Sequence, residues 1–168
     1  LSMGGFIAQA FCKNYQERLT ALMLGCTGPG IKDPNHIRFS DTIQDVLWSS
    51  RAEDELEESL KEFLNHFFHP EFIKNNNQFM KGALITAMND PQPEFAYRRQ
   101  LQSCYESGPF SEVHGEFKVP TLVMQGTDDE ITPYPNGQFL AQSIPNAELV
   151  TFDGTGHMFF IENKPKFI

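Results

Sequence analysis

Three short segments, each followed by a turn-rich loop, constrain the fold of this chain most strongly. They cover residues 19–25, 120–126 and 148–152. The first is a continuous apolar run, which is typical of a buried strand in a parallel sheet. Parallel strands need crossover connections, and residues 6–12 and 136–144 have the pattern of helices that fill this role. The sequence therefore predicts an α/β fold with parallel strands and crossover helices.

The middle of the chain, residues 31–110, carries helical patterns and no strand signal. Ser50 and Glu53 have the spacing of a capping box at the start of a helix, and Pro70 is expected to end that helix. Apolar side chains then recur at three- and four-residue steps opposite charged ones, as on an amphipathic helix. Helices are expected over residues 56–68, 78–88 and 93–106.

These patterns divide the chain into two parts. Residues 1–30 and 111–168 are expected to form the α/β core, and residues 31–110 an inserted all-helical cap. The chain has 168 residues, of which 40% are hydrophobic, and this is enough for one domain with a sizeable core.

The first five residues have the pattern of a tight turn from a strand into a helix, with Ser2 at its apex. Such a turn pushes the serine hydroxyl out of the backbone path and exposes it above the sheet. Gly4 and Gly5 lack Cβ atoms, which permits the strained turn and a close approach of helix to strand. On this motif alone, an ordinary helix N-cap is a commoner role for Ser2 than that of a nucleophile.

Polar loops follow the second and third expected strands. The first loop contains Asp128 and Asp129, and the second ends at His157. In open parallel sheets, functional residues gather outside the C-terminal ends of the strands, so Ser2, Asp129 and His157 are expected at one edge. A serine hydroxyl needs a base to become a good nucleophile, and histidine accepts and returns a proton near neutral pH. A carboxylate holds the imidazole in the required tautomer.

The order of these three residues along the chain, with a serine on a strand-to-helix turn, resembles the α/β-hydrolase superfamily. The resemblance implies the C-terminal part of an α/β-hydrolase fold, with a helical cap at residues 31–110. The cap is similar to those of enol-lactone and carbon–carbon bond hydrolases. The resemblance rests on Ser2-Met3-Gly4-Gly5, on residues 120–133 and on Asp153-Gly154-Thr155-Gly156-His157.

The resemblance implies a hydrolase that cleaves an ester, lactone or related small acyl compound through an acyl-enzyme, without a cofactor or a metal. Ser2 is then the nucleophile and His157 the base. The acid is the third residue after Gly126, which is Asp129, and the adjacent Asp128 is its competitor.

The backbone N–H of Met3 is expected to supply one donor of the oxyanion hole. In the family, the second donor lies in a loop that would precede Leu1, and so would the first strand of the sheet. We therefore interpret the chain as an internal piece of a longer protein. Two alternatives stay open: a non-hydrolytic member, such as a lyase or a cofactor-free haloperoxidase-like enzyme, or a fragment that is inactive without the preceding strands.

The composition argues against several partners. A formal net charge of -9 disfavours nucleic acid and anionic membrane surfaces, and no apolar run approaches the length of a membrane span. The oligomeric state is left open. The wide spacing of Cys12, Cys26 and Cys104 gives neither a disulfide framework nor a CxxC pair. Reduced thiols in a cytoplasmic protein are expected, with Cys12 and Cys26 in the core.

Other candidate residues carry weaker signals. His66 and His69 have helical spacing but no evident third metal ligand, and His36 and His114 have no partner in the sequence. Aromatic residues of the helical segment are expected to form its core or to line an apolar pocket. The residues considered for the pocket are Trp48, Phe67, Phe68, Phe72 and Phe79, together with one of Met158, Phe159 and Phe160.

Overall fold

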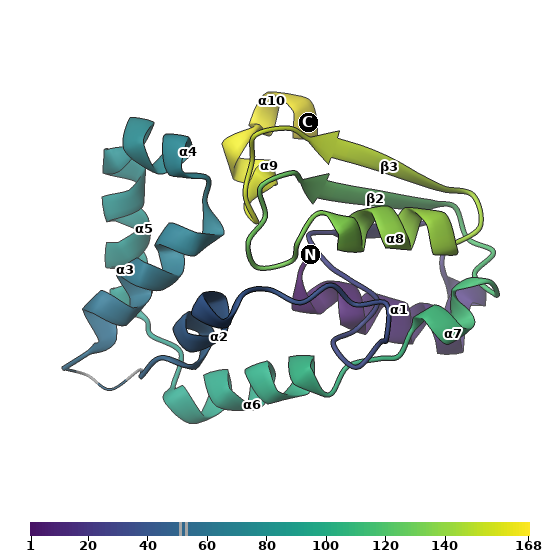
Figure 1. Ribbon diagram of the computed structural model, residues 1–168, viewed down its shortest axis with the longest axis horizontal. Coiled ribbons are helices and arrows are strands. Elements are labelled where there is room, and N and C mark those ends of the chain that lie inside the picture. The colour runs from purple at the N-terminus through teal and green to yellow at the C-terminus, as the bar shows by residue number, and fades with distance from the viewer. Residues whose placement is uncertain (51, 53) are drawn as a thin grey trace.

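Three parallel strands form the central sheet of the computed structural model, which describes residues 1–50, 52 and 54–168. The strands lie in the order β1-β2-β3, and Val123 of β2 pairs with Leu24 on one side and Leu149 on the other. Their bounds are Leu22–Gly25 for β1, Thr121–Gly126 for β2 and Ala147–Phe152 for β3 (Figure 1). The predicted parallel α/β arrangement is confirmed.

One face of the sheet is covered by α1 (Met3–Tyr15) and α8 (Pro135–Ser143). Leu22 and Leu24 point into the core beneath these helices, whereas Met23 between them is 58% exposed. Alternate side chains of a strand point to opposite faces, so β1 is buried mainly on one face of the described structure rather than on both. The core here consists of Cys12, Leu22, Leu24, Phe117, Val119, Val123, Leu140 and Ile144.

A second core cluster involves the C-terminal part of the chain. Phe159, the first residue of α9 (Phe159–Glu162), packs with Cys26, Met124 and Phe152. The short helix α10 (Lys164–Phe167) follows, and Phe167 makes an edge-on contact with Phe159. Cys12 and Cys26 are both buried and free, as expected.

The helical segment, residues 31–110, contains no strand among its described residues. It holds two helices more than expected, α2 and α4. The prediction that Pro70 ends α3 is wrong. That helix ends at Phe67, and Pro70 is the first residue of α4, a position that suits its fixed φ. The expected capping box pairs Ser50 with Glu53, and Glu53 lies outside the described residues. The five helices are α2 (Asp41–Trp48), α3 (Leu56–Phe67), α4 (Pro70–Asn75), α5 (Asn77–Asn89) and α6 (Glu94–Tyr105).

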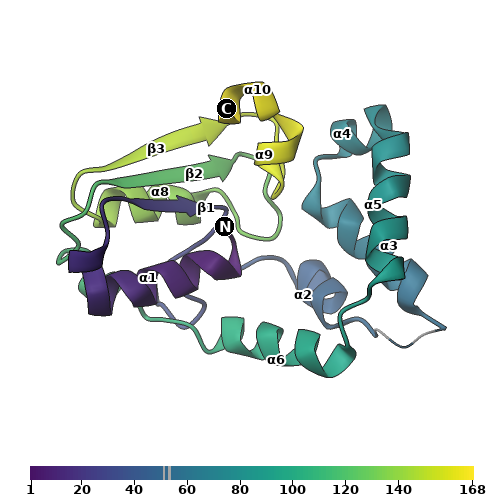
Figure 2. The ribbon, with the colours of Figure 1, turned by 180° about the vertical axis from the view of Figure 1, so that it is seen from behind.

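The helical segment stands beyond the C-terminal edge of the sheet. The arrowheads of β2 and β3 point toward α3, α4 and α5, and the N-terminus lies at the same edge (Figures 1 and 2). Short helices η1 (Gln16–Arg18) and α7 (Ser111–His114) precede β1 and β2. The sheet edge that was expected to carry the site therefore faces the helical segment.

Every described helix is too short or too polar to cross a lipid bilayer.

A buried polar network joins α7 to α1. The Nε2 atom of His114 lies 2.9 Å from Oε1 of Gln9, and its Nδ1 lies 2.7 Å from the hydroxyl of Ser143. The amide nitrogen of Gln9 donates to the carbonyls of Gly5 and Gly28. His114 therefore has partners that lie far from it in the sequence, and burial lowers its pKa to about 4.

Because His114 is buried, we expect the free energy of unfolding to fall in acid. Its pKa in the folded state lies below the ordinary value of ~6.5, so the unfolded chain binds the proton first as the pH falls from ~6.5 to ~4. We expect this to remove about 3 kcal/mol of unfolding free energy. Urea titrations of the wild type and of His114→Gln, which does not titrate, measure the difference. Equal pH dependence in the two proteins would contradict the prediction.

Candidate active site

Ser2 sits at the N-terminus of α1 in an unusual backbone conformation. Its φ of 50° and ψ of -126° are rare for a residue other than glycine and store strain. The backbone N–H of Ser2 donates to the carbonyl of Gly25 at 2.9 Å, which holds the turn beside the end of β1. The Ser2 side chain makes no capping hydrogen bond. The geometry is thus that of a strained turn with an available hydroxyl, and the ordinary N-cap role does not apply.

The neighbouring residues of the turn have different roles. A Cβ at Gly5 would collide with the side chain of Thr27, so α1 closely approaches the segment that directly follows β1. A Cβ at Gly4 would meet no described atom within 4 Å, so the close approach requires only one of the two glycines. Met3 is the first residue of α1, and the N–H groups of a first helical turn have no partner within the helix.

Asp129 and His157 form a buried pair between the loops that follow β2 and β3. His157 Nδ1 lies 2.8 Å from Oδ2 and 3.0 Å from Oδ1 of Asp129. Both side chains are almost fully inaccessible to solvent. Because a carboxylate only accepts hydrogen bonds, Nδ1 carries the proton, and in the neutral ring Nε2 is left as the proton acceptor.

Neighbouring groups fix the Asp129 carboxylate in place. Its Oδ1 accepts the backbone N–H groups of Ile131 and Thr132 at 2.9 and 2.8 Å. Its Oδ2 accepts the side-chain N–H of Gln125 at 2.8 Å, and the same amide donates to the carbonyl of Thr132. Gln125 is fully buried at the end of β2. Gln125 was not predicted as a supporting residue, because its position in the strand pattern indicated only a sheet residue.

The adjacent Asp128 does not take the place of Asp129. Its side chain is 52% exposed and accepts a hydrogen bond from the hydroxyl of Thr127. His69 approaches its carboxylate only to 3.9 Å. The structure therefore brings His157 together with the aspartate that the register of the motif predicted.

The electrostatics of His157 are dominated by two opposing effects. Burial on its own lowers the pKa of the imidazole, but the Asp129 carboxylate and, to a smaller extent, the Cys26 thiol raise it to about 10. The Nε2 atom of His157 is buried and has no hydrogen-bond partner among the described residues. A buried polar atom without a partner is uncommon in a folded protein and calls for a functional explanation.

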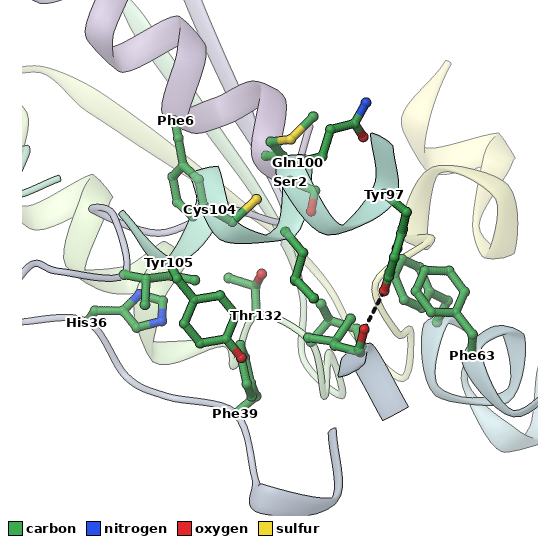
Figure 3. Close-up of a pocket in the computed structure, with 16 residues that line it drawn as sticks. Ser2, Phe6, His36, Phe39, Phe63, Tyr97, Gln100, Cys104, Tyr105 and Thr132 are labelled. Carbon is green, nitrogen blue, oxygen red and sulfur yellow. Dashed lines mark hydrogen bonds between the residues drawn. The ribbon is translucent and has the colours of Figure 1, made fainter. Parts of the chain in front are cut away.

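A cavity of about 200 Å³ opens beside Ser2 at the boundary between the sheet edge and the helical segment. In Figure 3, Ser2 lies between Phe6 and Tyr97 on one side of this cavity. Phe67 also lines it, and the ring of Phe67 contacts the imidazole of His157 edge-on, with centroids 5.0 Å apart. Most of the lining is apolar: it includes Phe6, Ile31, Phe39, Leu47, Phe63, Phe67, Leu101 and Ile131.

Phe67 is the only one of the aromatic residues considered for the pocket that lines this cavity. Phe68, Phe72 and Phe79 instead pack on one another, with ring centroids 5.3–5.7 Å apart. Phe159 is buried in the core, where it packs with Cys26, Met124 and Phe152. The residues of α6 that face the cavity were not predicted, because their helical pattern does not show which side meets the sheet edge. They are Tyr97, Gln100, Leu101, Cys104 and Tyr105.

His66 and His69 lie near acidic side chains rather than in a cluster of metal ligands. His66 Nδ1 is 2.7 Å from a carboxylate oxygen of Glu130, and His69 accepts the backbone N–H of Glu71 at the start of α4. Within residues 1–50, 52 and 54–168, no group of three or more His, Cys, Asp or Glu side chains is arranged to hold a metal ion.

The fold and the site together define a class: an α/β protein with a strained serine turn and a buried histidine–aspartate pair at the C-terminal edge of a parallel sheet. A sequence model of the α/β-hydrolase fold matches residues 1–164. The chain belongs to the α/β-hydrolase family.

Individual relatives are hydrolases with different substrates in their names. A 2-hydroxy-6-oxononadienedioate/2-hydroxy-6-oxononatrienedioate hydrolase of Paraburkholderia phymatum is 30% identical over 169 residues, which cover 99% of this chain and 57% of that protein. A proline iminopeptidase of Lactobacillus helveticus is 25% identical over 185 residues, covering 99% of this chain and 60% of the relative. The chain thus spans somewhat more than half the length of these curated relatives.

A solved structure shows the same fold. The enol-lactonase from Burkholderia xenovorans superposes with a TM-score of 0.79 at 20% sequence identity, covering 99% of this chain and 60% of the enzyme. The predicted fold class, the C-terminal part of an α/β-hydrolase fold, agrees with this match.

Proposed function

We propose that the natural protein that carries this sequence hydrolyses an ester, lactone or related small acyl compound, with Ser2, His157 and Asp129 as its catalytic triad. The observation that carries the proposal is the buried contact of His157 with Asp129 at the sheet edge that also holds the strained Ser2 turn. The hydrolase names of the relatives support the reaction class.

In the proposed reaction, the Ser2 hydroxyl oxygen attacks the substrate carbonyl and its proton passes to Nε2 of His157. The tetrahedral intermediate collapses to an acyl-enzyme as His157 returns the proton to the leaving group. Water, activated by the same imidazole, then releases the acid and restores Ser2. Asp129 keeps Nδ1 protonated and stabilises the imidazolium at each transfer. The reaction requires no cofactor.

The backbone N–H of Met3 is proposed to stabilise the oxyanion of the tetrahedral intermediate. It lies directly after Ser2, in the first turn of α1, where N–H groups lack helical partners and the helix dipole favours negative charge. Donors of this kind stabilise charge that develops only in the transition state.

The helical segment, residues 31–110, is proposed to act as a cap that defines the substrate pocket. Residues from α2, α3 and α6 line the cavity beside Ser2, and most of its wall is apolar. A cavity of about 200 Å³ with this lining suits a small, partly hydrophobic acyl group. The same triad also serves lyases and haloperoxidase-like enzymes, and assays of ester and lactone hydrolysis separate these activities.

The proposal is tested by labelling with a fluorophosphonate, which reacts covalently with an activated serine. We expect one adduct on the natural protein, located at Ser2 by mass spectrometry, because Ser2 is the hydroxyl that the proposed triad activates. Ser2→Ala should remove the adduct. Ser103→Ala, which changes an exposed serine of α6, is the matched control and should label normally. An adduct at any other residue would overturn the assignment.

A further inference from the structure

The carboxylate of Glu162, the last residue of α9, reaches back to the loop that carries His157. Its two oxygens lie 3.1 and 3.2 Å from the backbone nitrogen of Gly156, the residue directly before His157. One of these oxygens also accepts the backbone N–H of His69 at 3.2 Å. A single side chain therefore joins the histidine loop to the connection between α3 and α4.

The two backbone segments that Glu162 joins lie very close together. A Cβ at Gly156 would come within 3.0 Å of the nitrogen of His69 and 3.1 Å of the carbonyl carbon of Phe68. The backbone N–H of Met158 donates to the carbonyl of Phe67 at 3.1 Å. Residues 67–69 thus run along residues 156–158, with His157 between these contacts.

Burying the Glu162 carboxylate costs free energy unless its hydrogen bonds are made. Burial raises the pKa of its carboxyl group, and the N–H groups of Gly156 and His69 oppose this shift. A partly buried carboxylate loses hydration, which only well-placed donors replace. The backbone N–H groups of Gly156 and His69 are these donors, so they hold the Glu162 side chain in place.

We propose that Glu162 is a positioning residue for the reaction: it acts through His157 by fixing the backbone of Gly156 against the helical segment. This inference rests on the proposed function of Ser2, Asp129 and His157. The bond from His157 Nδ1 to Asp129 sets the ring on one side, and the clamped backbone of Gly156 sets the point from which the side chain projects. Together they set the orientation of the imidazole, whose Nε2 has to face Ser2 in the proposed reaction.

The expected kinetic effect follows from how strongly the rate of proton transfer depends on the position of the catalytic group. A displacement of about 1 Å in a catalytic group costs on the order of 100-fold in rate. Glu162→Ala removes the acceptor for both N–H groups and should lower kcat between about 10- and 100-fold, with KM changed less than about threefold. Glu162→Gln keeps one acceptor oxygen and should recover most of this loss.

The test measures kcat and KM for a small ester with the natural protein and four variants. Gly156→Ala is a second way to disturb the clamp, since its new Cβ would press on Phe68 and His69, and should also lower kcat. Glu148→Ala, which removes an exposed glutamate of β3, is the matched control and should leave kcat unchanged. The His157 Nδ1 proton, followed by NMR of protein with ¹⁵N-labelled histidine, reports the Asp129 contact independently of turnover.

We expect the downfield Nδ1 proton signal of His157 to shift or broaden in Glu162→Ala and to stay near its wild-type position in Glu162→Gln. Wild-type kcat and an unchanged signal in Glu162→Ala would overturn the positioning role. So would equal losses in the Ala and Gln variants. These results leave the proposed function intact, because that proposal is tested separately by labelling of Ser2 and by its removal.

Discussion

Ser2→Ala is expected to lower kcat for ester hydrolysis by a factor on the order of 10⁴ to 10⁶ in the natural protein that carries this sequence. The variant lacks the oxygen that would form the acyl-enzyme, so only binding and oxyanion stabilisation remain. The cavity wall loses one hydroxyl and keeps its apolar residues, so we expect substrate binding to change little. Steady-state kinetics together with the dissociation constant of a non-hydrolysed analogue measure the two effects separately.

The backbone at Ser2 adds a stability criterion to this prediction. Alanine has the same difficulty as serine at a φ of 50°, and the Ser2 hydroxyl makes no capping bond that its removal would break. The free energy of unfolding should therefore change by less than about 0.5 kcal/mol. Loss of activity with unchanged stability is the result that identifies Ser2 as the nucleophile. Retention of hydrolysis within tenfold of wild type would exclude that role.

Asp129→Asn is expected to lower kcat by about 10⁴-fold, or about 5.5 kcal/mol of transition-state stabilisation. The asparagine oxygen can still accept the N–H groups of Ile131 and Thr132, which favours retention of the loop. An amide N–H facing His157 Nδ1 would instead favour the tautomer with the proton on Nε2, which cannot accept the proton of Ser2. Asp128→Asn, at the exposed neighbour, is the matched control and should stay within about threefold of wild type.

The pH dependence of the Asp129→Asn variant follows from the same contact. The carboxylate raises the pKa of His157, so kcat/KM of the wild type should increase as the pH rises and the imidazolium loses its proton. Without the charge of Asp129, burial lowers this pKa, and the increase should move to lower pH. The ion pair also stabilises the folded wild type fully below pH ~6.5, and this advantage over the variant should disappear as the pH rises toward about 10. Parallel pH profiles for the two proteins would contradict this interpretation.

The positions of Ser2, Asp129 and His157 could be predicted because each depends on a local pattern. A strand followed by a polar loop places its loop residues at the C-terminal edge of a parallel sheet, whatever the rest of the chain does. The choice of Asp129 over Asp128 followed from counting residues after a glycine, and the contact with His157 agrees with it. The catalytic roles remain proposals for the experiments above.

The supporting residues could not be predicted because they depend on contacts between distant segments. Phe67 touches His157 across 90 positions of sequence, and His114 finds Gln9 across 105. The pattern of α3 showed that Phe67 and Phe68 were both apolar, but not that Phe67 faces the cavity while Phe68 packs on Phe72. The sequence did not indicate a supporting role for Glu162, because a glutamate in a short helix is usually exposed to solvent.

The insertion point of the helical segment separates the residues proposed to transfer protons from the residues proposed to choose the substrate. The segment begins after β1 and ends before β2, whereas the proposed acid and base follow β2 and β3, whose spacing is set by backbone hydrogen bonds. Evolution or a protein engineer can therefore exchange residues 31–110 and reshape the cavity without moving Asp129 relative to His157. The junction at residues 67–69 limits this freedom, since any replacement has to present a backbone donor to Glu162 and an aromatic ring to the imidazole.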